Sequence, residues 1–162
     1  MYDYSKREEV SRYLLWSPHL SIRMTRAHLR YVCSQYKKNN FFDWAIVEKE
    51  SAKMIGTCGF SRIDAENNSA EIGYVLSSDY WGMGYATEAV ARVIAFGFET
   101  CGFNRIYARI LEGNTASMRV AEKNMLRREA THKNAIIVKD AYKTYHEYAI
   151  LQSEYFAYRH EM

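Results

Sequence analysis

The chain alternates between two kinds of hydrophobic spacing, and this alternation predicts where helices and strands lie. Apolar residues recur every three or four positions, the period of a helix with one buried face, in residues 5–14, 25–36, 85–100 and 114–124. Short runs rich in β-branched and aromatic residues, bounded by polar turns, predict strands at residues 41–49, 54–63, 69–76, 104–111, 135–139 and 143–151. The order is two helices, a three-strand antiparallel meander, a crossover helix, a strand, a helix and closing strands. This order predicts a mixed α/β fold.

Local signals predict where the first two helices begin and end. Ser5 and Glu8 have the S-x-x-E spacing of a capping box, so the first helix is predicted to begin near Ser5 and to break at Ser17–Pro18. The second helix is predicted to end at the polar run "KKNN", residues 37–40. Its apolar face is predicted to comprise Leu29, Val32, Cys33 and Tyr36.

Length and composition indicate a single domain over residues 1–162. Apolar residues make up 48% and charged residues 25%, close to globular averages, and no linker or internal repeat divides the chain. The net charge of +3 is spread along the sequence, which argues against a nucleic-acid partner but suits an anionic ligand. No apolar run approaches the length that crosses a membrane, so no membrane partner is expected.

The cysteines and histidines predict no metal site. Cys33, Cys58 and Cys101 have no C-x-x-C spacing, and the five histidines include no H-x-x-x-H or H-E-x-x-H pair. Three scattered cysteines cannot all pair, so we expect reduced thiols in a cytoplasmic protein. The first ten residues lack the apolar segment of a signal peptide.

The stretch "WGMGYA", residues 81–86, joins a predicted strand to a predicted helix and contains two glycines. Such a turn directs several N–H groups and the positive end of the helix dipole toward one point, which suits a phosphate. The same glycines also suit a tight turn that needs them only for its dihedral angles. A P-loop is excluded because no G-x-x-x-x-G-K-[ST] run is present, and a dinucleotide fingerprint is disfavoured because Thr87 occupies its third glycine position.

Three blocks of sequence, in the same order, resemble the GNAT N-acetyltransferase superfamily over residues 5–155. "WGMGYA" is similar to its [QR]-x-x-G-x-[GA] acetyl-coenzyme A signature, and "AEIGYVLSSDYWGMGYATEAV" resembles the RimJ/RimL-like branch, which acetylates ribosomal-protein N-termini. "CGFNRIYARILEGNTASMRVAEKNMLRREA" resembles the second block of that branch, in which an N-x-x-S motif leads into a helix, and "KDAYKTYHEYAIL" resembles its closing strands. The resemblance implies a mostly antiparallel twisted sheet that splays apart at the coenzyme A site and is flanked by helices.

The sequence departs from that family pattern in several places. Trp81 stands where the superfamily has Gln or Arg, and Ala121 where many members carry a tyrosine proposed as general acid. Asn124 and Met125 replace the usual Gly-Phe, so Asn124 is expected to adopt a left-handed conformation in the turn after its helix. The chain also begins at the first helix, whereas relatives usually begin with a strand, so the first strand of the fold is expected to be absent.

The resemblance implies acetyl-CoA as co-substrate, no metal, and direct transfer of the acetyl group to an amine. Main-chain N–H groups of residues 82–86 would hold the pyrophosphate, the edge of residues 74–77 would pair with the pantetheine arm, and the Leu76 amide would hold the thioester carbonyl. The residues implied in cofactor binding are Tyr74, Val75, Leu76, Trp81, Gly82, Met83, Gly84, Tyr85, Ala86, Thr87, Asn114 and Ser117.

Two side chains are candidates for the chemistry that the resemblance implies. Since Ala121 cannot donate a proton, Ser117 is the candidate acid for the departing thiolate, with solvent as the alternative. Glu71 is the candidate base, because a half-buried strand carboxylate near the cleft can accept a proton through water. The alternatives for Glu71 are a solvated face or an ion pair with Arg62. Asn114 fits the N-cap of its helix as well as a coenzyme contact.

The acceptor is left open. It is either a protein N-terminal amine or a small amine such as a polyamine, an amino acid or an antibiotic, and Trp16 and His19 are candidate contacts. A homodimer is the candidate assembly. The alternative function is a coenzyme A-binding module without catalysis, because the usual tyrosine is absent and the chain starts late.

Overall fold

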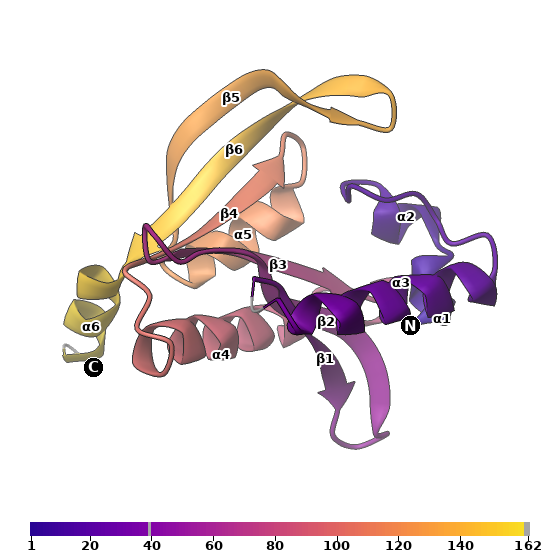
Figure 1. The fold of residues 1–162 in the computed structure, drawn as a ribbon, viewed down its shortest axis with the longest axis horizontal. Coiled ribbons are helices and arrows are strands. Elements are labelled where there is room, and N and C mark those ends of the chain that lie inside the picture. The colour runs from indigo at the N-terminus through magenta and orange to yellow at the C-terminus, as the bar shows by residue number, and fades with distance from the viewer. Residues whose placement is uncertain (39, 161–162) are drawn as a thin grey trace.

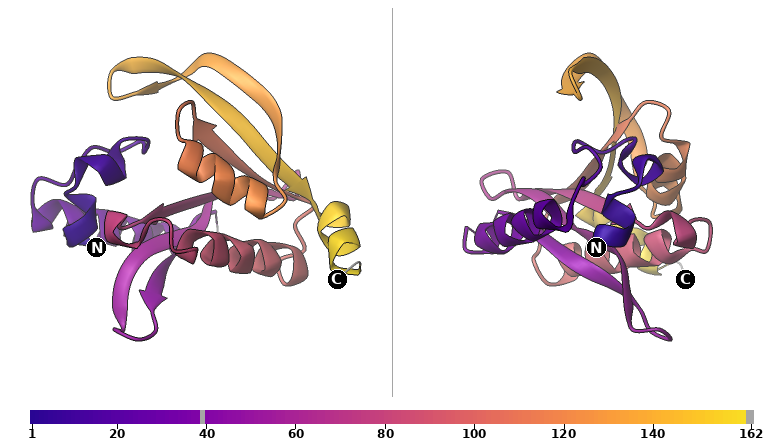
Figure 2. Two further views of the ribbon diagram at one scale, coloured as in Figure 1. Left: turned by 180° about the vertical axis from the view of Figure 1, so that it is seen from behind. Right: turned by 90° about the vertical axis from the view of Figure 1, so that its right-hand side faces the viewer.

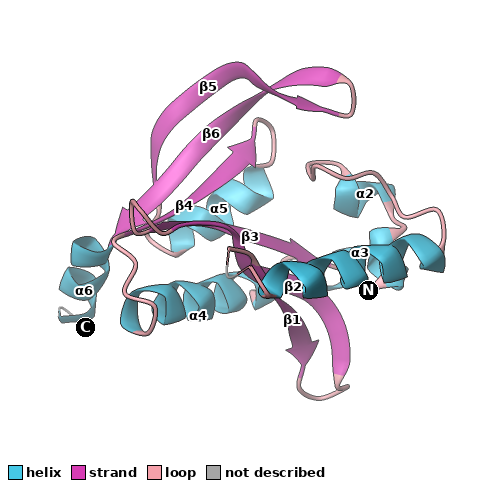
Figure 3. Ribbon diagram, in the orientation of Figure 1, coloured by secondary structure: helices cyan, strands magenta, loops and turns pink. Residues whose placement is uncertain are grey.

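The computed structural model describes residues 1–38 and 40–160, so Asn39 of the predicted "KKNN" loop and the last two residues of the predicted domain lie outside the described residues. The elements are α1 (Tyr2–Ser5), α2 (Glu8–Ser11), α3 (Ile22–Tyr36), β1 (Phe42–Glu48), β2 (Lys53–Asp64), β3 (Ser69–Leu76), a 3₁₀ turn (Ser78–Tyr80), α4 (Tyr85–Glu99), β4 (Arg105–Leu111), α5 (Thr115–Lys123), β5 (Arg127–Val138), β6 (Ala141–Leu151) and α6 (Gln152–His160). Helices and strands are mixed along the chain, which confirms the predicted α/β class (Figure 3).

The described strands form one sheet in the order β1-β2-β3-β4-β6-β5 (Figure 1). Strands β1, β2 and β3 pair antiparallel, which confirms the predicted meander. Strand β4 lies parallel to β3, and α4 makes the crossover that a parallel pair requires. Strand β6 lies between β4 and β5 and is antiparallel to both. The β5–β6 hairpin curves toward the side where α2 lies, and Lys139 at its tip donates to the Ser11 carbonyl oxygen at 2.8 Å.

The core lies where α4 packs against the sheet. Val90 and Ile94 of α4 are buried together with Phe60 of β2 and Ile106 of β4. Gly97 allows this close approach, because a Cβ at that position would come within 2.7 Å of Ile106 Cδ1 and 2.9 Å of Phe60 Cζ. Helix α5 lies next to α4, as the view from behind in Figure 2 shows. The packing of α4 fixes where its N-terminal turn lies relative to β3.

The N-terminal segment differs from the prediction. Ser5 ends α1 instead of beginning a helix, and α2 begins at Glu8 with Arg7 as its N-cap and no side-chain cap. The predicted capping box is wrong because Ser5 is fully buried and its carbonyl oxygen accepts from the His19 N–H at 2.9 Å, so tertiary packing decides its conformation.

Helix α3 confirms the second predicted helix, but its buried face is narrower than expected. Val32 is buried, as predicted, and Thr25 is buried as well. Leu29 and Cys33 are exposed, so this part of the predicted apolar face is wrong.

The segment after α5 corrects two further expectations. Met125, with a φ of 64°, adopts the left-handed conformation, whereas Asn124 has a φ of −99°. Asn124 instead uses its side-chain amide, which donates to the Thr87 carbonyl oxygen at 3.3 Å and so links α5 to α4. Strand β5 begins at Arg127 rather than residue 135, because most of it is an exposed edge strand without the alternation that signals a strand. Helix α6 was not predicted.

Candidate active site

Strands β3 and β4 separate part-way along their length, and this opens the sheet. Their parallel pairing covers only Ser69–Glu71 and Arg105–Tyr107. Beyond that point β3 pairs with β2 and β4 pairs with β6 (Figure 1). The end of β3 therefore has main-chain groups on its β4 side that no strand occupies, as expected for a splayed sheet.

Trp81 orients the last residue of β3. Its indole N–H donates to the Leu76 carbonyl oxygen at 2.9 Å. The next residue, Ser77, instead donates its N–H to the Ile55 carbonyl oxygen on the β2 side at 2.7 Å. Because successive residues of a strand direct their N–H and C=O groups to opposite edges, the Leu76 N–H faces the opening. Trp81 thus has a specific role that its position in the sequence motif did not reveal.

The turn before α4 presents main-chain N–H groups to open space. Gly82 and Gly84 have φ angles of 77° and 89°, in the left-handed region that favours glycine. No protein atom lies within 4 Å of a Cβ built at either position. Gly84 is the N-cap of α4, so the first N–H groups of that helix lack partners within it. Free N–H groups and the helix dipole together favour an anion at this point.

Side chains near this turn attach it to its neighbours instead of reaching into the opening. The Tyr85 hydroxyl donates to Glu48 of β1 at 3.0 Å, and Arg7 donates to both carboxylate oxygens of Asp79 at 2.6 and 2.8 Å. The Met83 side chain is exposed. Contacts with β1 and with the N-terminal segment therefore hold the turn in place. The groups that the turn presents to a ligand are main-chain N–H groups.

Two hydroxyl groups meet between β3 and α5. Tyr74 Oη lies 2.7 Å from Ser117 Oγ and 3.0 Å from the Ser117 carbonyl oxygen. Burial raises the pKa of Tyr74, so its hydroxyl is protonated at neutral pH. Asn114 Oδ1 accepts from the Ser117 N–H at 3.2 Å, which is the N-cap contact anticipated for this residue. Ala121 is buried and has no hydroxyl. Sequence analysis had placed Tyr74 in the site without anticipating that its hydroxyl meets Ser117.

Glu71 forms an ion pair that the sequence did not predict. Its carboxylate accepts from Arg109 Nε at 2.9 Å and from the Arg109 terminal nitrogen at 2.8 Å, although the residue is only 9% exposed. The hydrogen bond with Glu71 raises the pKa of Arg109 above its ordinary value. Arg62 is the β2 residue opposite Glu71 in register, but the ion pair is formed with Arg109 across the β3–β4 boundary. The sequence signal was the alternation of Arg105, Tyr107 and Arg109 on one face of β4.

Glu71, Asn114 and Ser117 line one cavity of about 340 Å³. Most of its wall is apolar or aromatic, formed by Tyr13, Leu14, Leu15, Trp16, Phe41, Phe42, Ile136 and Tyr145. Trp16 is thus at the cavity, as sequence analysis suggested. His19 is buried behind it, with its Nδ1 2.8 Å from Thr25 Oγ1. The cavity brings together the N-terminal segment, β1, the β3–β4 opening, α5 and the β5–β6 hairpin.

Asp43 of β1 also lines this cavity, and sequence analysis missed it. Burial raises its pKa to about 6, against a smaller opposing effect of a hydrogen bond from Thr57. The available signal was a single carboxylate within the apolar run "FFDWAIV". A partly buried acid that lines a cavity is a candidate functional group.

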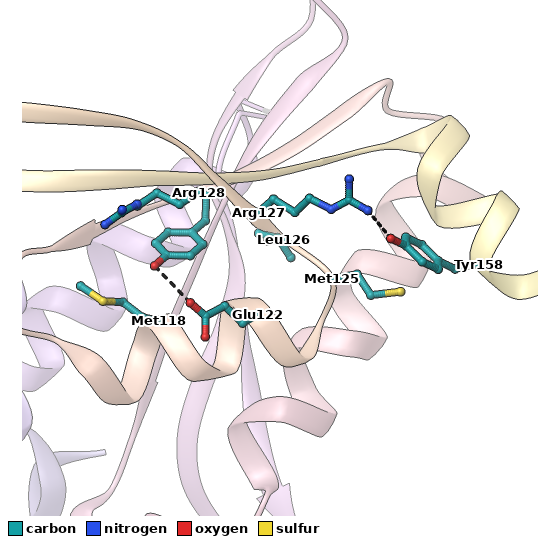
Figure 4. Close-up of a pocket in the computed structure, with 8 residues that line it drawn as sticks. Met118, Glu122, Met125, Leu126, Arg127, Arg128 and Tyr158 are labelled. Atoms are coloured by element: carbon teal, nitrogen blue, oxygen red, sulfur yellow. Dashed lines mark hydrogen bonds between the residues drawn. The ribbon is translucent and has the colours of Figure 1, made fainter.

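A second, more open hollow lies between α5, the start of β5 and α6 (Figure 4). It is lined by Met118, Glu122, Met125, Leu126, Arg127, Arg128, Tyr148 and Tyr158. Two of its charged groups have local partners, because Tyr148 donates to Glu122 at 3.4 Å and Arg127 donates to Tyr158. No residue predicted for the site lines it.

Within residues 1–38 and 40–160, no group of three or more His, Cys, Asp or Glu side chains is placed to hold a metal ion. The described helices include none with the length and apolar character needed to span a membrane.

The splayed sheet and the glycine turn at the head of α4 define an acetyltransferase fold. A spermidine N-acetyltransferase from Vibrio cholerae, solved with CoA and spermine, superposes with a TM-score of 0.81 at 17% identity, covering 96% of this chain and 89% of its own. The ribosomal-protein-S5-alanine acetyltransferase from Vibrio fischeri superposes with a TM-score of 0.76 at 23% identity, covering 94% and 87%. These likenesses concern the fold.

Sequence comparison gives the family. The profile of the acetyltransferase (GNAT) domain matches residues 1–127. An uncharacterized N-acetyltransferase, p20 from Bacillus licheniformis, is 31% identical over 147 residues, which cover 91% of this chain and 83% of that protein. The chain belongs to the GNAT acetyltransferase family, and it is an N-acetyltransferase.

Proposed function

We propose that this enzyme binds acetyl-CoA in the β3–β4 opening and transfers the acetyl group directly to a primary amine in the adjoining cavity. The observation that carries the proposal is the separation of β3 from β4 beyond Glu71, which leaves the Leu76 N–H facing the opening. The glycine turn that follows β3 and the contact of Ser117 Oγ with Tyr74 Oη of β3 support it. The fold likeness to a spermidine N-acetyltransferase solved with CoA supports it.

The glycine turn fits a pyrophosphate. A Cβ at Gly82 or Gly84 would point into space that no protein atom fills, which leaves room for phosphate oxygens close to the backbone. The N–H groups of residues 82–86 would donate to those oxygens. Tyr85, Ala86 and Thr87 begin α4, and the dipole of that helix would further stabilise the negative charge of the pyrophosphate. The main chain of Tyr74, Val75 and Leu76 would hydrogen-bond to the pantetheine arm, as one strand pairs with the next in a sheet.

The Leu76 N–H and the two hydroxyl groups would act on the thioester. The Leu76 N–H would donate to the carbonyl oxygen as negative charge develops there, with Trp81 keeping it in place. Ser117 Oγ would protonate the departing sulfur and recover a proton from the acceptor nitrogen, while Tyr74 Oη holds the Ser117 hydroxyl in place. Asn114 would hold the start of α5 and thereby position Ser117.

Glu71 remains the base predicted from the sequence, but Arg109 limits that role. An ammonium group at Glu71 would share the carboxylate with a guanidinium of the same charge. Substitution of Glu71 by Gln therefore tests whether it takes a proton or positions Arg109.

The acceptor is a primary amine, either the N-terminus of a protein or a small molecule. The structural neighbours include one whose name refers to each kind of acceptor. One is the ribosomal-protein-S5-alanine acetyltransferase, and the other is the spermidine N-acetyltransferase. The RimJ/RimL-like assignment, the homodimer and the cytoplasmic location stay predictions.

A thiol-release assay with acetyl-CoA against a panel of amines and peptides with free N-termini tests the proposed function. We expect Ser117→Ala to lower kcat by about 100-fold, the low end of the range for a lost general acid, because Tyr74 remains. Ser153→Ala, at an exposed serine of α6, is the matched control and should leave kcat unchanged. A wild-type protein that binds acetyl-CoA but releases thiol with no amine would instead be a coenzyme A-binding module.

A further inference from the structure

Asp43 is a cavity carboxylate without a basic partner. Glu71, the other carboxylate lining the cavity, is bonded to Arg109 through both oxygens. Among the described residues, Asp43 forms no ion pair with a Lys, Arg or His side chain. The neutral hydroxyl of Thr57 is the side-chain group that opposes the rise in its pKa. A partly buried carboxylate without a basic partner has its charge unopposed, which makes it a site for a cation from outside the chain.

The surroundings of Asp43 also contain an unused hydrogen-bond donor. Tyr4 is buried, and its hydroxyl has no hydrogen-bond partner among the described residues. Burial and then the charge of Asp43 raise the pKa of Tyr4, so the two groups lie within each other's field. A buried hydroxyl without a partner is unfavourable, so a polar atom from water or a ligand is expected beside it. Tyr4 does not line the cavity, so its hydroxyl lies behind Asp43 rather than on the cavity wall.

The rest of the cavity wall is apolar rather than acidic. Trp16 and Tyr13 come from the N-terminal segment, Phe42 precedes Asp43 in β1, and Tyr145 comes from β6. The pKa of His28, which also lines the cavity, is lowered by burial and by His19, so that imidazole is neutral at neutral pH. One unopposed negative charge within aromatic walls suits one positive charge on an apolar body. A polyamine would place its further ammonium groups against these walls without a counter-charge.

We propose that Asp43 binds the ammonium group of the acceptor and accepts its proton, and that the cavity selects primary amines with one positive charge and an apolar or aromatic body. This inference rests on the acetyl transfer proposed above. The ammonium proton goes to the Asp43 carboxylate and then to water. The neutral nitrogen forms its bond to the acetyl carbon, the carbon–sulfur bond breaks, and the second nitrogen proton goes to the sulfur through Ser117.

Substrate comparison tests the selectivity. The wild-type chain is assayed with acetyl-CoA and 2-phenylethylamine, a phenylalanine-initiated peptide amide without other charges, or spermidine. We expect kcat/KM at least about tenfold higher for one or both single-charge amines than for spermidine, and the first two arms distinguish a small amine from a peptide terminus. A preference for spermidine would overturn the proposed selectivity.

Substitution of Asp43 tests its role. Asp43→Asn should lower kcat/KM for the preferred amine by about 100-fold, the range of a lost general base, while the affinity for acetyl-CoA is unchanged. Asp64→Asn, at the far end of β2, is the matched control and should leave both unchanged. Activity retained in Asp43→Asn but lost in Glu71→Gln would assign the base to Glu71 and overturn the inference.

The pH profile gives a second measurement that does not depend on Asp43→Asn folding. Tyr4, Tyr36 and Cys58 are the groups that interact with the Asp43 charge, and the pKa of each is raised, so none titrates near pH 6. Thr57→Val removes the hydrogen bond that lowers the pKa of Asp43, so the acidic limb of kcat/KM should move to higher pH. The limb should persist in His28→Gln, since His28 is the imidazole that lines the cavity. An unmoved limb in Thr57→Val would overturn the inference, whereas absence of thiol release from the wild type with every amine would overturn the proposed function and the inference with it.

Discussion

Replacing Gly84 by Ala separates the conformational role of the glycine turn from its role in binding. Gly84 has a φ of 89° and caps α4, and a Cβ there would project into space where no protein atom lies within 4 Å. Gly102, after the other end of α4, has a φ of 68° and equally open surroundings. Gly102→Ala is therefore a matched control, with similar backbone strain at a position outside the site.

The two variants should lose similar stability but differ in affinity. A left-handed conformation costs an L-residue about 1–2 kcal/mol, and the reduced entropy of the unfolded chain offsets about 0.4–1 kcal/mol of this. The net loss of about 1 kcal/mol corresponds to a fall in Tm of about 2–4 °C for a chain of this size. At Gly84 alone, the added methyl group occupies the phosphate position. Loss of one hydrogen bond to a charged group costs about 1.5–3 kcal/mol, which raises the Kd for acetyl-CoA by about 10- to 150-fold.

Thermal unfolding measures the first effect and isothermal titration with acetyl-CoA measures the second. The reasoning requires comparable Tm values for the two variants and a large difference in Kd between them. If Gly84→Ala binds acetyl-CoA as tightly as Gly102→Ala does, the turn needs glycine only for its own dihedral angles and does not hold the pyrophosphate.

Three further predictions concern packing and charge. Arg109→Met leaves the Glu71 carboxylate buried without its partner and should reduce the free energy of unfolding by about 1–3 kcal/mol. The loss is smaller than for a fully buried pair because Arg109 is partly exposed. Urea denaturation measures this loss, and a value below about 0.5 kcal/mol would contradict the prediction. Gly97→Ala should lower Tm, because the added methyl group would be overpacked against Ile106 and Phe60. Overpacking costs about 1–3 kcal/mol, which exceeds the gain of about 1 kcal/mol from the higher helix propensity of Ala. A higher Tm would show that the Ile106 and Phe60 side chains move aside. The pKa of Asp43 is raised to about 6 from about 4 in the unfolded chain, so the folded state binds more protons between these values and stability should fall as pH rises from about 4 to 6. Asp43→Asn should reduce that slope in unfolding curves, and an unchanged slope would exclude Asp43 as its source.

The parts of the fold that sequence predicted well are those in which local pattern and tertiary environment agree. The meander and α4 have strong periodicity over their full length, and the glycine turn needs its two positive φ angles whatever surrounds it. Where the two disagree, packing decided the outcome. Ser5 has the spacing of a cap but is buried at the end of α1, and Asn124 could adopt a left-handed conformation but bonds to α4 through its side chain while Met125 makes the turn.

The same distinction between local pattern and tertiary packing applies to the two sides of the candidate site. The coenzyme side is built from nearly contiguous residues, because β3, the turn and the start of α4 follow one another in residues 74–87. A motif can therefore describe it, and main-chain donors tolerate a change such as Trp81 within it. The ion pair of Glu71 with Arg109 joins residues that are far apart in sequence, and only the parallel register of β3 and β4 brings them together.

The acceptor side has no such contiguous segment. Its cavity combines Trp16, Asp43, Arg109 and Tyr145, which four separate parts of the chain contribute. Substitutions at these positions can change the charge and shape offered to the amine while every residue of the glycine turn stays the same. A family signature therefore carries information about the acyl donor and almost none about the acceptor. If the cavity determines selectivity, exchanging the aromatic wall at Trp16 and Tyr145 for carboxylates should move the preference toward polyamines without altering the Kd for acetyl-CoA. Because no residue of the glycine turn lines the cavity, substitutions in the aromatic wall and in the turn should change acceptor preference and coenzyme affinity independently.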